Sequence, residues 1–271
     1  MEKDDFFDVV NVRDEIDSLN PSNKKRLAEN FALAAVGSIP WVGGFIGAMV
    51  TYKNEGGNIK LNALQTKWLE EHHKKLERLN QTLNAIALRF ENLGDEISER
   101  LESEEYLDLV RKSFRVWNEA DTEEKRKLVS NMITNAVSVQ LCSDDIIRLF
   151  IDWLNNYHEI HFHVMRIIYQ TPGVTRYDIW TNLYASIPRE DSAEADLYRM
   201  LIRDLSTGGV IRQARNTTED GRFIKQKQVA HVKKTSSTME SAFEDTKQYV
   251  LTELGKQFVH YTMNEVVTRL D

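Results

Sequence analysis

The chain has 271 residues, of which 41% are hydrophobic and 28% charged, and its net charge is −7. This size and hydrophobic content exclude a disordered chain and predict one or two domains with a sizeable core. The acidic balance argues against wholesale coating of nucleic acid or anionic membrane, although local basic patches can still bind.

The N-terminal region predicts a cytoplasmic protein that begins with a helix. Its first residues, MEKDDFFDVV, are acidic, whereas a secretion signal needs a basic start and an apolar core. The single cysteine, Cys142, excludes an intramolecular disulfide and is typical of an intracellular chain. Residues 1–29 are predicted to form a polar helical lead-in, which Pro21 interrupts and which Ser22 can cap anew.

The next segment, Asn30–Tyr52, has 23 residues and no charge. Proline and glycines divide it near its middle, so we predict two short apolar helices joined as a hairpin at Gly37–Gly44, with an exit turn at Gly56-Gly57. The residues that we single out for packing or membrane contact are Phe31, Leu33, Gly37, Pro40, Trp41, Gly43 and Gly47.

Three interpretations of the apolar segment, Phe31–Val50, stay open. Its 20 residues just meet the length of a membrane span. Its proline and four glycines make insertion marginal, because each Leu, Ile, Phe or Val contributes only about −0.3 to −0.6 kcal/mol. The segment is therefore a buried hairpin, a membrane element released from a soluble form, or a constitutive anchor. An apolar hairpin beside a long amphipathic helix resembles the layout of α-helical pore-forming proteins.

A long heptad pattern follows the apolar segment. Its positions alternate in steps of three and four, which predicts a helix of the coiled-coil type over about 45 residues and roughly 65–70 Å. Gly94 is a weak point in this helix. The helix can pack within its own bundle or pair with a second chain. The positions are Leu61, Gln65, Trp68, His72, Leu76, Leu79, Leu83, Ile86, Phe90, Leu93, Ile97 and Leu101.

Further helices are predicted from residue 104 to residue 156, with one starting near Asp121–Glu124. After them the pattern changes. Helices are predicted at Glu159–Gln170, Tyr177–Tyr184 and Ala193–Ser206, the last capped by Ser192. A β-hairpin is predicted from Val210–Arg215 and Phe223–Val229 around the polar turn 216–221.

This order is that of a winged helix-turn-helix. The segment Tyr249–Phe258 strengthens the prediction, because it resembles the "Y-x-L-T-x-x-G-x-x-F" ending of winged-helix proteins, in which a short strand pairs with the wing and Thr252 caps a final helix. The predicted fold is mostly α: an extended helical bundle with a long coiled-coil-like helix, plus a C-terminal winged helix-turn-helix (α+β) domain. The predicted domains are residues 1–57, 58–156 and 157–271.

The winged helix offers candidate nucleic-acid contacts of two kinds. Glu194 and Asp196 at the start of the reading helix would repel phosphates, and its usable cations are Arg199 and Arg203. The wing, from Arg212 to Lys234, carries seven basic and two acidic residues, which suits contact with the phosphate backbone. A solvated wing without a partner is the alternative. The wing candidates are Arg212, Arg215, Arg222, Lys225 and Lys227.

No set of residues supports catalysis. The chain lacks the glycine-rich nucleotide motifs and the nucleophile elbow of hydrolases, and it predicts no cofactor. His158 and His161 would share a helix face that could hold a metal, but no cysteine supports such a site and His163 points elsewhere. We therefore predict a non-enzymatic protein without a metal site.

The segment Tyr106–Val137 resembles a helical pattern in bacterial proteins of the abortive-infection alpha type. Those proteins tend to have a Gly-rich apolar N-terminal region, helices with an acid–Lys–Arg–Leu pattern, and a C-terminal region of winged-helix character. Where their core usually reads "W-A-x-L-L-A", this chain has Leu128–Ile133. The resemblance implies phage defence and carries over no functional residues.

Three functions follow as expectations. The first is a bacterial defence effector that acts by self-association or membrane perturbation under control of the winged helix. The second is a DNA-binding regulator that dimerises through its coiled coil, and the third is a protein-interaction scaffold. The corresponding partners are a second copy of the chain in a homo-oligomer, a membrane met conditionally, nucleic acid, and a phage or host protein.

Overall fold

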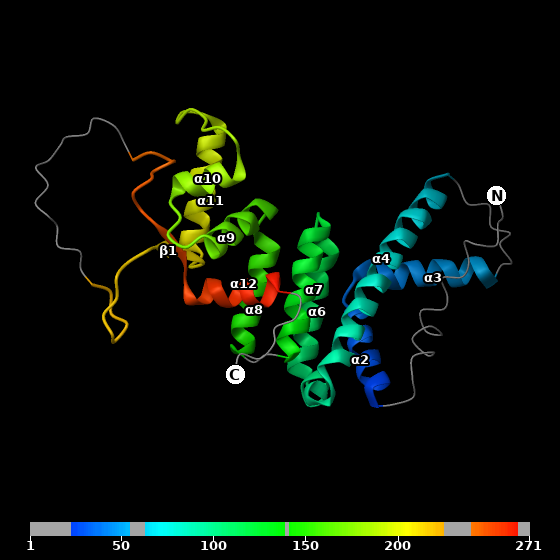
Figure 1. Ribbon diagram of the computed structural model, residues 1–271. Helices are drawn as coiled ribbons and strands as arrows, with labels where there is room; N and C mark the ends of the chain where they lie inside the picture. Colours follow the sequence, from blue (N-terminus) through cyan, green and yellow to red (C-terminus); the bar gives the residue numbers. More distant parts are fainter. Residues whose placement is uncertain (1–22, 55–62, 139–140, 225–239, 265–271) are drawn as a thin grey trace, which may run out of the picture. The chain divides into compact units, whose positions relative to one another are not determined.

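The computed structural model describes residues 23–54, 63–138, 141–224 and 240–264. These residues are mostly helical, with one small two-stranded sheet, which confirms the mostly α prediction. The chain divides into two compact units. Unit 1 contains the chain up to Asn156 and again from Tyr261, and unit 2 is Tyr157–His260. Figure 1 labels the elements of both.

Unit 1 is a helical bundle with α6 at its centre, in contact with α2, α7 and α8. The side chain of Ser103 caps α6 by accepting a hydrogen bond from the backbone N–H of Tyr106. The Tyr106 side chain is fully buried, and its hydroxyl donates to the Ile133 carbonyl at 2.9 Å. The helices are α2 (Asn23–Gly37), α3 (Pro40–Asn54), α4 (Ala63–Leu93), α5 (Ser98–Glu102), α6 (Glu104–Glu119), α7 (Glu123–Ser138) and α8 (Asp144–Asn156).

The long heptad helix is shorter than its pattern predicts. α4 ends at Leu93, because Gly94 takes the left-handed conformation with φ 77°, and a 3₁₀ turn, η2 (Asp95–Ile97), follows. The prediction of one helix over about 45 residues was therefore wrong at Gly94. The seam itself packs inside unit 1, where α4 contacts α2, α3 and α7. Its buried residues are His72, Leu76, Leu79, Leu83, Ile86, Phe90, Ile97 and Leu101.

The two apolar helices were predicted as a hairpin, and this geometry was wrong. α2 and α3 meet at 95° across a break of two residues, Ser38 and Ile39. Ile39 is buried, and Pro40 starts α3, a position where its missing N–H costs nothing.

The described residues of unit 2 form three helices, two short strands and most of a fourth helix. The predicted helices lie within one residue of their expected bounds at α9 (Glu159–Gln170), α10 (Arg176–Leu183) and α11 (Ala193–Thr207). Local capping explains this agreement, because Thr175 and Ser192 accept backbone hydrogen bonds at the starts of α10 and α11. Trp180, Tyr198 and Phe243 pack ring against ring in the core of the unit.

The described strands of unit 2 form one antiparallel pair, as expected for the short strand at Tyr249–Leu251. β1 (Ile211–Gln213) pairs antiparallel with β2 (Tyr249–Leu251), with Arg212 opposite Val250. Only one isolated bridge, Thr217 to Phe223, closes the polar turn, and the predicted strand beyond Ile224 lies outside the described residues. After β2, the Thr252 hydroxyl accepts from the Gly255 N–H at 2.9 Å and starts α12 (Glu253–Met263).

Candidate functional site

One side of α3 packs firmly inside unit 1. Val42, Phe45 and Met49 recur at helical spacing and are buried. Phe45 lies against Trp68 and His72 of α4, with ring centroids 6.2 and 6.3 Å away. The Trp41 indole N–H donates to the Asn118 side chain at 2.7 Å and so ties the start of α3 to the end of α6. α3 is therefore held in place by one apolar side.

The other side of α3 is apolar and exposed. Gly43, Ile46, Gly47 and Val50 recur at positions i, i+3, i+4 and i+7, and Gly44 and Ala48 flank them. Ile46 and Val50 keep 49% and 48% of their surface in solvent. A side-chain carbon added at any of the three glycines would meet nothing within 4 Å. We call these six residues the α3 surface.

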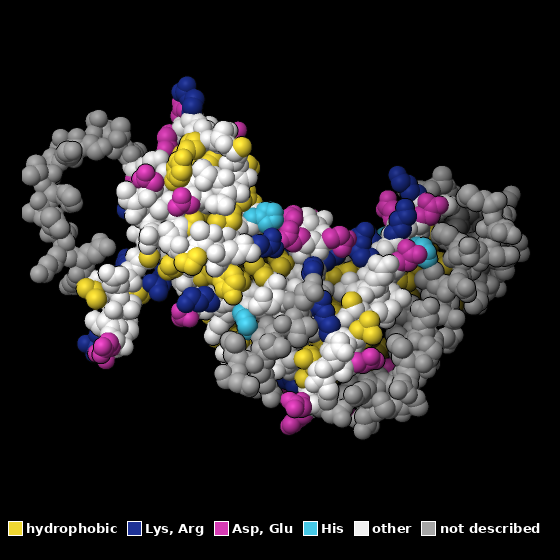
Figure 2. Space-filling view, in the orientation of Figure 1, with side chains coloured by type: hydrophobic (Ala, Val, Ile, Leu, Met, Phe, Trp, Pro, Cys, Tyr) yellow, Lys and Arg dark blue, Asp and Glu magenta, His cyan; other side chains and the backbone are white. Residues whose placement is uncertain are grey.

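The α3 surface contrasts with the exposed side of α4. There, charged side chains of both signs alternate along the first half of the helix (Figure 2). Such a side is well solvated and needs no partner. The α3 surface has no charged residue, and Pro40–Tyr52 as a whole has none.

The structure divides the seven residues predicted for packing or membrane contact. Phe31 is a core residue with its ring edge-on to Phe90 and Phe114, and Trp41 is half-buried. The remaining five are exposed: Leu33, Gly37, Pro40, Gly43 and Gly47. Gly43 and Gly47 are spaced so as to allow a close helix approach, but an added side-chain carbon at either would meet no atom within 4 Å.

The α2–α3 pair was also compared with the length and apolarity of a membrane span. Among the described helices, none crosses that threshold by itself. Ala28–Gly37 and Pro40–Thr51 reach the length and apolarity of a membrane span only when taken together, and these two helices are bent by 95°.

A groove of about 740 Å³ lies between α2 and α6. Leu33 lines it and is 71% exposed, beside the buried side chains of Ala34 and Leu107. Arg111 in the same groove is bound by Glu104 and Asp108, which raises the pKa of its guanidinium. The groove therefore has an apolar wall and an edge on which Arg111 is paired with two carboxylates.

The two arginines predicted to read DNA from α11 are already engaged or lie beside an acid. Arg199 donates to the Glu190 carbonyl and to Asp196, and it forms an ion pair with Glu190. Arg203 is well exposed and lies 3.7 Å from Asp204. Because Arg199 would have to leave two carboxylates to reach a base, its predicted role is weakened.

The described wing candidates lie in β1 and in the exposed turn after it, and we call residues 212–224 the basic turn. The guanidinium groups of Arg212 and Arg215 stand 4.9 and 5.8 Å from the ring centroid of Phe223, which is half-exposed. Arg222 is exposed on the same turn. Lys225 and Lys227 lie outside the described residues.

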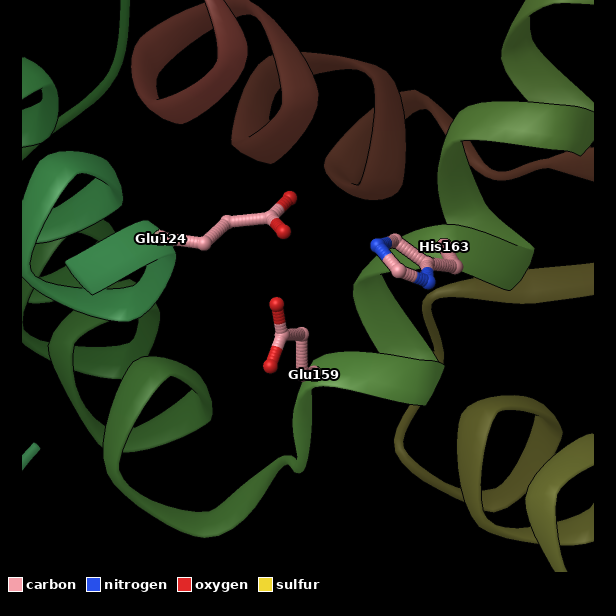
Figure 3. Close-up of side chains that lie close together, drawn as sticks. All are labelled: Glu124, Glu159 and His163. Carbon is pink, nitrogen blue, oxygen red and sulfur yellow. The ribbon is translucent and has the colours of Figure 1, made fainter. Parts of the chain in front are cut away.

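His158 and His161, the pair weighed as metal ligands, lie at the start of α9. His161 is buried, and its Nδ1 already accepts the backbone N–H of His158 at 3.1 Å. Figure 3 shows Glu159 and His163 on successive turns of α9 with side chains on the same side of that helix. These two groups supply half of the four ligands that a zinc site takes.

Burial is the main cause that lowers the pKa of His161, and the nearby Asp204 carboxylate opposes it in part. The folded state therefore binds this proton less tightly than the unfolded state, whose pKa lies near 6.5. We expect stability to be fully present above pH 6.5 and to fall below it. Urea midpoints at pH 7.5 and 5.5 measure this loss, which should be smaller in His161→Gln. Equal losses in both chains would contradict it.

Sequence reasoning missed a polar cluster in the core of unit 1. Asn131 and Asn135 of α7 are both 1% exposed. Their amides donate to the carbonyls of Thr262, Tyr261 and Asn264 at 2.9 to 3.0 Å, at the end of α12. The available signal was a pair of asparagines, four residues apart, on the apolar side of a helix.

With this geometry established, the chain was compared with known proteins. A scan against protein-family models found no match, and searches of curated proteins and of solved structures found no similar protein. Functional argument therefore rests on the residues themselves.

Proposed function

We propose that this chain is a non-enzymatic effector that acts by covering its α3 surface, through self-association or against a membrane, under the control of unit 2. One observation carries the proposal: α3 is apolar on both sides, and only one side is packed. A helix that is hydrophobic all round is normally buried. The exposed side is therefore a surface that a partner would stabilise.

The magnitudes favour a surface that can be covered and uncovered. Burying a whole Val or Ile side chain stabilises by about 1.5–3 kcal/mol, so the exposed halves of Ile46 and Val50 offer about 2 kcal/mol together. The glycines add little burial, but they let another helix or lipid approach the backbone closely. Such a gain suits conditional association better than permanent anchoring.

The biological setting that we propose is bacterial phage defence of the abortive-infection kind. Its support is the resemblance of Tyr106–Val137 to the helical pattern of those proteins. In this chain that segment forms the central helix α6 and its partner α7. The defence role is consistent with an apolar surface that stays covered, or with a protein that stays at low concentration, until it is needed.

We further propose that unit 2 is a winged helix-turn-helix domain. Its support is the order of elements, with α9, α10 and α11 followed by β1, the basic turn, β2 and α12. The register of β1 with β2 and the Thr252 cap fit the ending that the sequence pattern suggests. In this interpretation α11 is the reading helix and the basic turn is the wing.

Dye release from lipid vesicles tests the membrane form of the proposal. The full chain should release dye. A Gly43→Leu/Gly47→Leu variant should release less, because bulky side chains block close approach. Gly37→Leu is the matched control, since Gly37 has the same open space but lies on α2. No release by the wild type, or equal release by the double variant, would remove the membrane form.

A second candidate function is binding to the DNA backbone through the basic turn. The observation in its favour is that Arg212 and Arg215 lie over the exposed Phe223 ring, with the exposed Arg222 on the same turn. Duplex binding should then weaken with salt, and each arginine that contacts a phosphate contributes about −0.9 to the slope of log K against log salt.

Replacing these three arginines with alanine should flatten the salt dependence of duplex binding. Arg148→Ala, an exposed arginine paired with Asp145 in unit 1, is the control and should leave the slope unchanged. Fluorescence anisotropy of a labelled duplex over a salt series measures the slope. A slope that does not change in the triple variant would count against this function.

A further inference from the structure

Two buried amides of α7 hold the C-terminal turn of α12, and one of them also holds α4. Asn131 Oδ1 accepts from Arg89 of α4 at 2.8 Å, and Asn131 Nδ2 donates to the Thr262 carbonyl at 2.9 Å. We infer that Arg89, Asn131 and Asn135 form a latch that couples the end of α12 to the apolar segment. The consequence for activity rests on the proposed function.

The coupling follows from the chemistry of a single amide group. The oxygen and nitrogen of a side-chain amide lie in one plane and turn together. If Asn131 rotates to follow the Thr262 carbonyl, its oxygen leaves Arg89. Because the amide is buried, an intermediate orientation would leave a polar group unsatisfied. Asn131 therefore keeps both hydrogen bonds, to Arg89 and to Thr262 (latch closed), or loses both (latch open).

On one side the latch leads to the apolar segment. Arg89 precedes Phe90, whose ring stands edge-on to the ring of Phe31 with centroids 5.2 Å apart. Phe31 is the first residue of the apolar segment and is buried in the core. A displacement of the last turn of α4 therefore reaches α2 by direct contact, and α2 leads into α3 after a break of two residues.

On the other side the latch leads into unit 2 through a continuous helix. α12 starts at Glu253, and its residues before Tyr261 belong to unit 2, whereas Tyr261 and the residues after it belong to unit 1. The last carbonyls of a helix have no partner within it, and here Asn131 and Asn135 supply partners. A pull or twist on α12 acts directly on these bonds.

Two substitutions of Asn131 separate the two halves of the latch. Asn131→Asp keeps the acceptor for Arg89 but cannot donate to Thr262, so it opens only the α12 side. Asn131→Leu removes both bonds. Asn135→Ala removes the two bonds that Asn135 Nδ2 donates to the Tyr261 and Asn264 carbonyls, on the α12 side. Ser130→Ala is the control, since Ser130 bonds within its own helix.

Amide hydrogen exchange of the full chain measures the opening of each half of the latch, the α12 side and the α4 side. In Asn131→Leu we expect exchange about fivefold faster both in the last turn of α12 and in residues 89–93, the factor for about one net hydrogen bond. In Asn131→Asp and Asn135→Ala only α12 should accelerate. Arg89→Ala, at a half-buried site that tolerates truncation, should accelerate residues 89–93. Acceleration of α12 alone in Asn131→Leu would overturn the coupling.

Dye release then tests the consequence. Asn131→Leu should release more dye than wild type, and Asn131→Asp should match wild type. Equal release by these two variants, where the wild type is active, would overturn the regulatory role. If no chain releases dye, the membrane form of the proposed function fails, and the exchange pattern still decides whether the latch couples α12 to α4.

Discussion

Phe31→Ala should destabilise unit 1 by about 3–5 kcal/mol, the cost of emptying a buried aromatic site. Phe31 keeps only 2% of its surface exposed, and its ring packs edge-on against Phe90 and Phe114, with centroids 5.2 and 5.8 Å away. α2, α4 and α6 meet at this point, so the cavity cannot close by moving one helix. Urea unfolding followed by circular dichroism measures the loss.

Leu33→Ala is the matched control for Phe31→Ala. Leu33 is also an apolar residue of α2, but 71% of its surface is exposed, so its loss should change stability by no more than about 0.5 kcal/mol. The comparison has a functional meaning. If the apolar segment left the bundle as one piece, Phe31 would have to leave the core. Equal effects of the two substitutions would contradict the assignment of Phe31 to the core.

Ile46→Glu should abolish association through the α3 surface. Replacing an apolar side chain at a covered helix site by a charged one costs about 3 kcal/mol, which corresponds to roughly a 100-fold loss of affinity. The fold should survive, because about half of the Ile46 surface faces solvent and the space around the neighbouring Gly43 and Gly47 is open. Sedimentation over a concentration series measures the change.

Leu88→Glu is the control for Ile46→Glu. Leu88 is an apolar residue of α4 with 61% of its surface exposed, so the same chemical change is made away from α3. Its association should equal that of wild type. A loss of association in both variants would mean that added negative charge, and not the α3 surface, governs the behaviour of this acidic chain.

Local signals predicted the helices of unit 2 and the start of α7. Ser192 and Thr175 cap the helices that follow them, and Thr122 accepts from the Lys125 N–H at the start of α7. A cap lies within three residues of what it satisfies, so the printed sequence contains all the information. The end of α4 at Gly94 was less predictable. The heptad pattern continues through the glycine, and only its left-handed conformation breaks the helix.

Two features of the candidate site could not be predicted from sequence. The α3 segment is apolar on every side, so its periodicity could not tell the packed side from the exposed one. Asn131 and Asn135 bind carbonyls more than 120 residues away, and no local pattern announces such partners. The engagement of Arg199 by Glu190 likewise depends on how the loop before α11 folds back.

The account depends most on the claim that the α3 surface is covered when the protein acts. Sedimentation velocity of the full chain and of Ile46→Glu, each with and without lipid vesicles, tests this most directly. The account predicts that wild type forms oligomers or sediments with the vesicles, whereas Ile46→Glu stays monomeric and unbound in both conditions. Wild type that is monomeric and unbound throughout, or Ile46→Glu that behaves as wild type does, would contradict it.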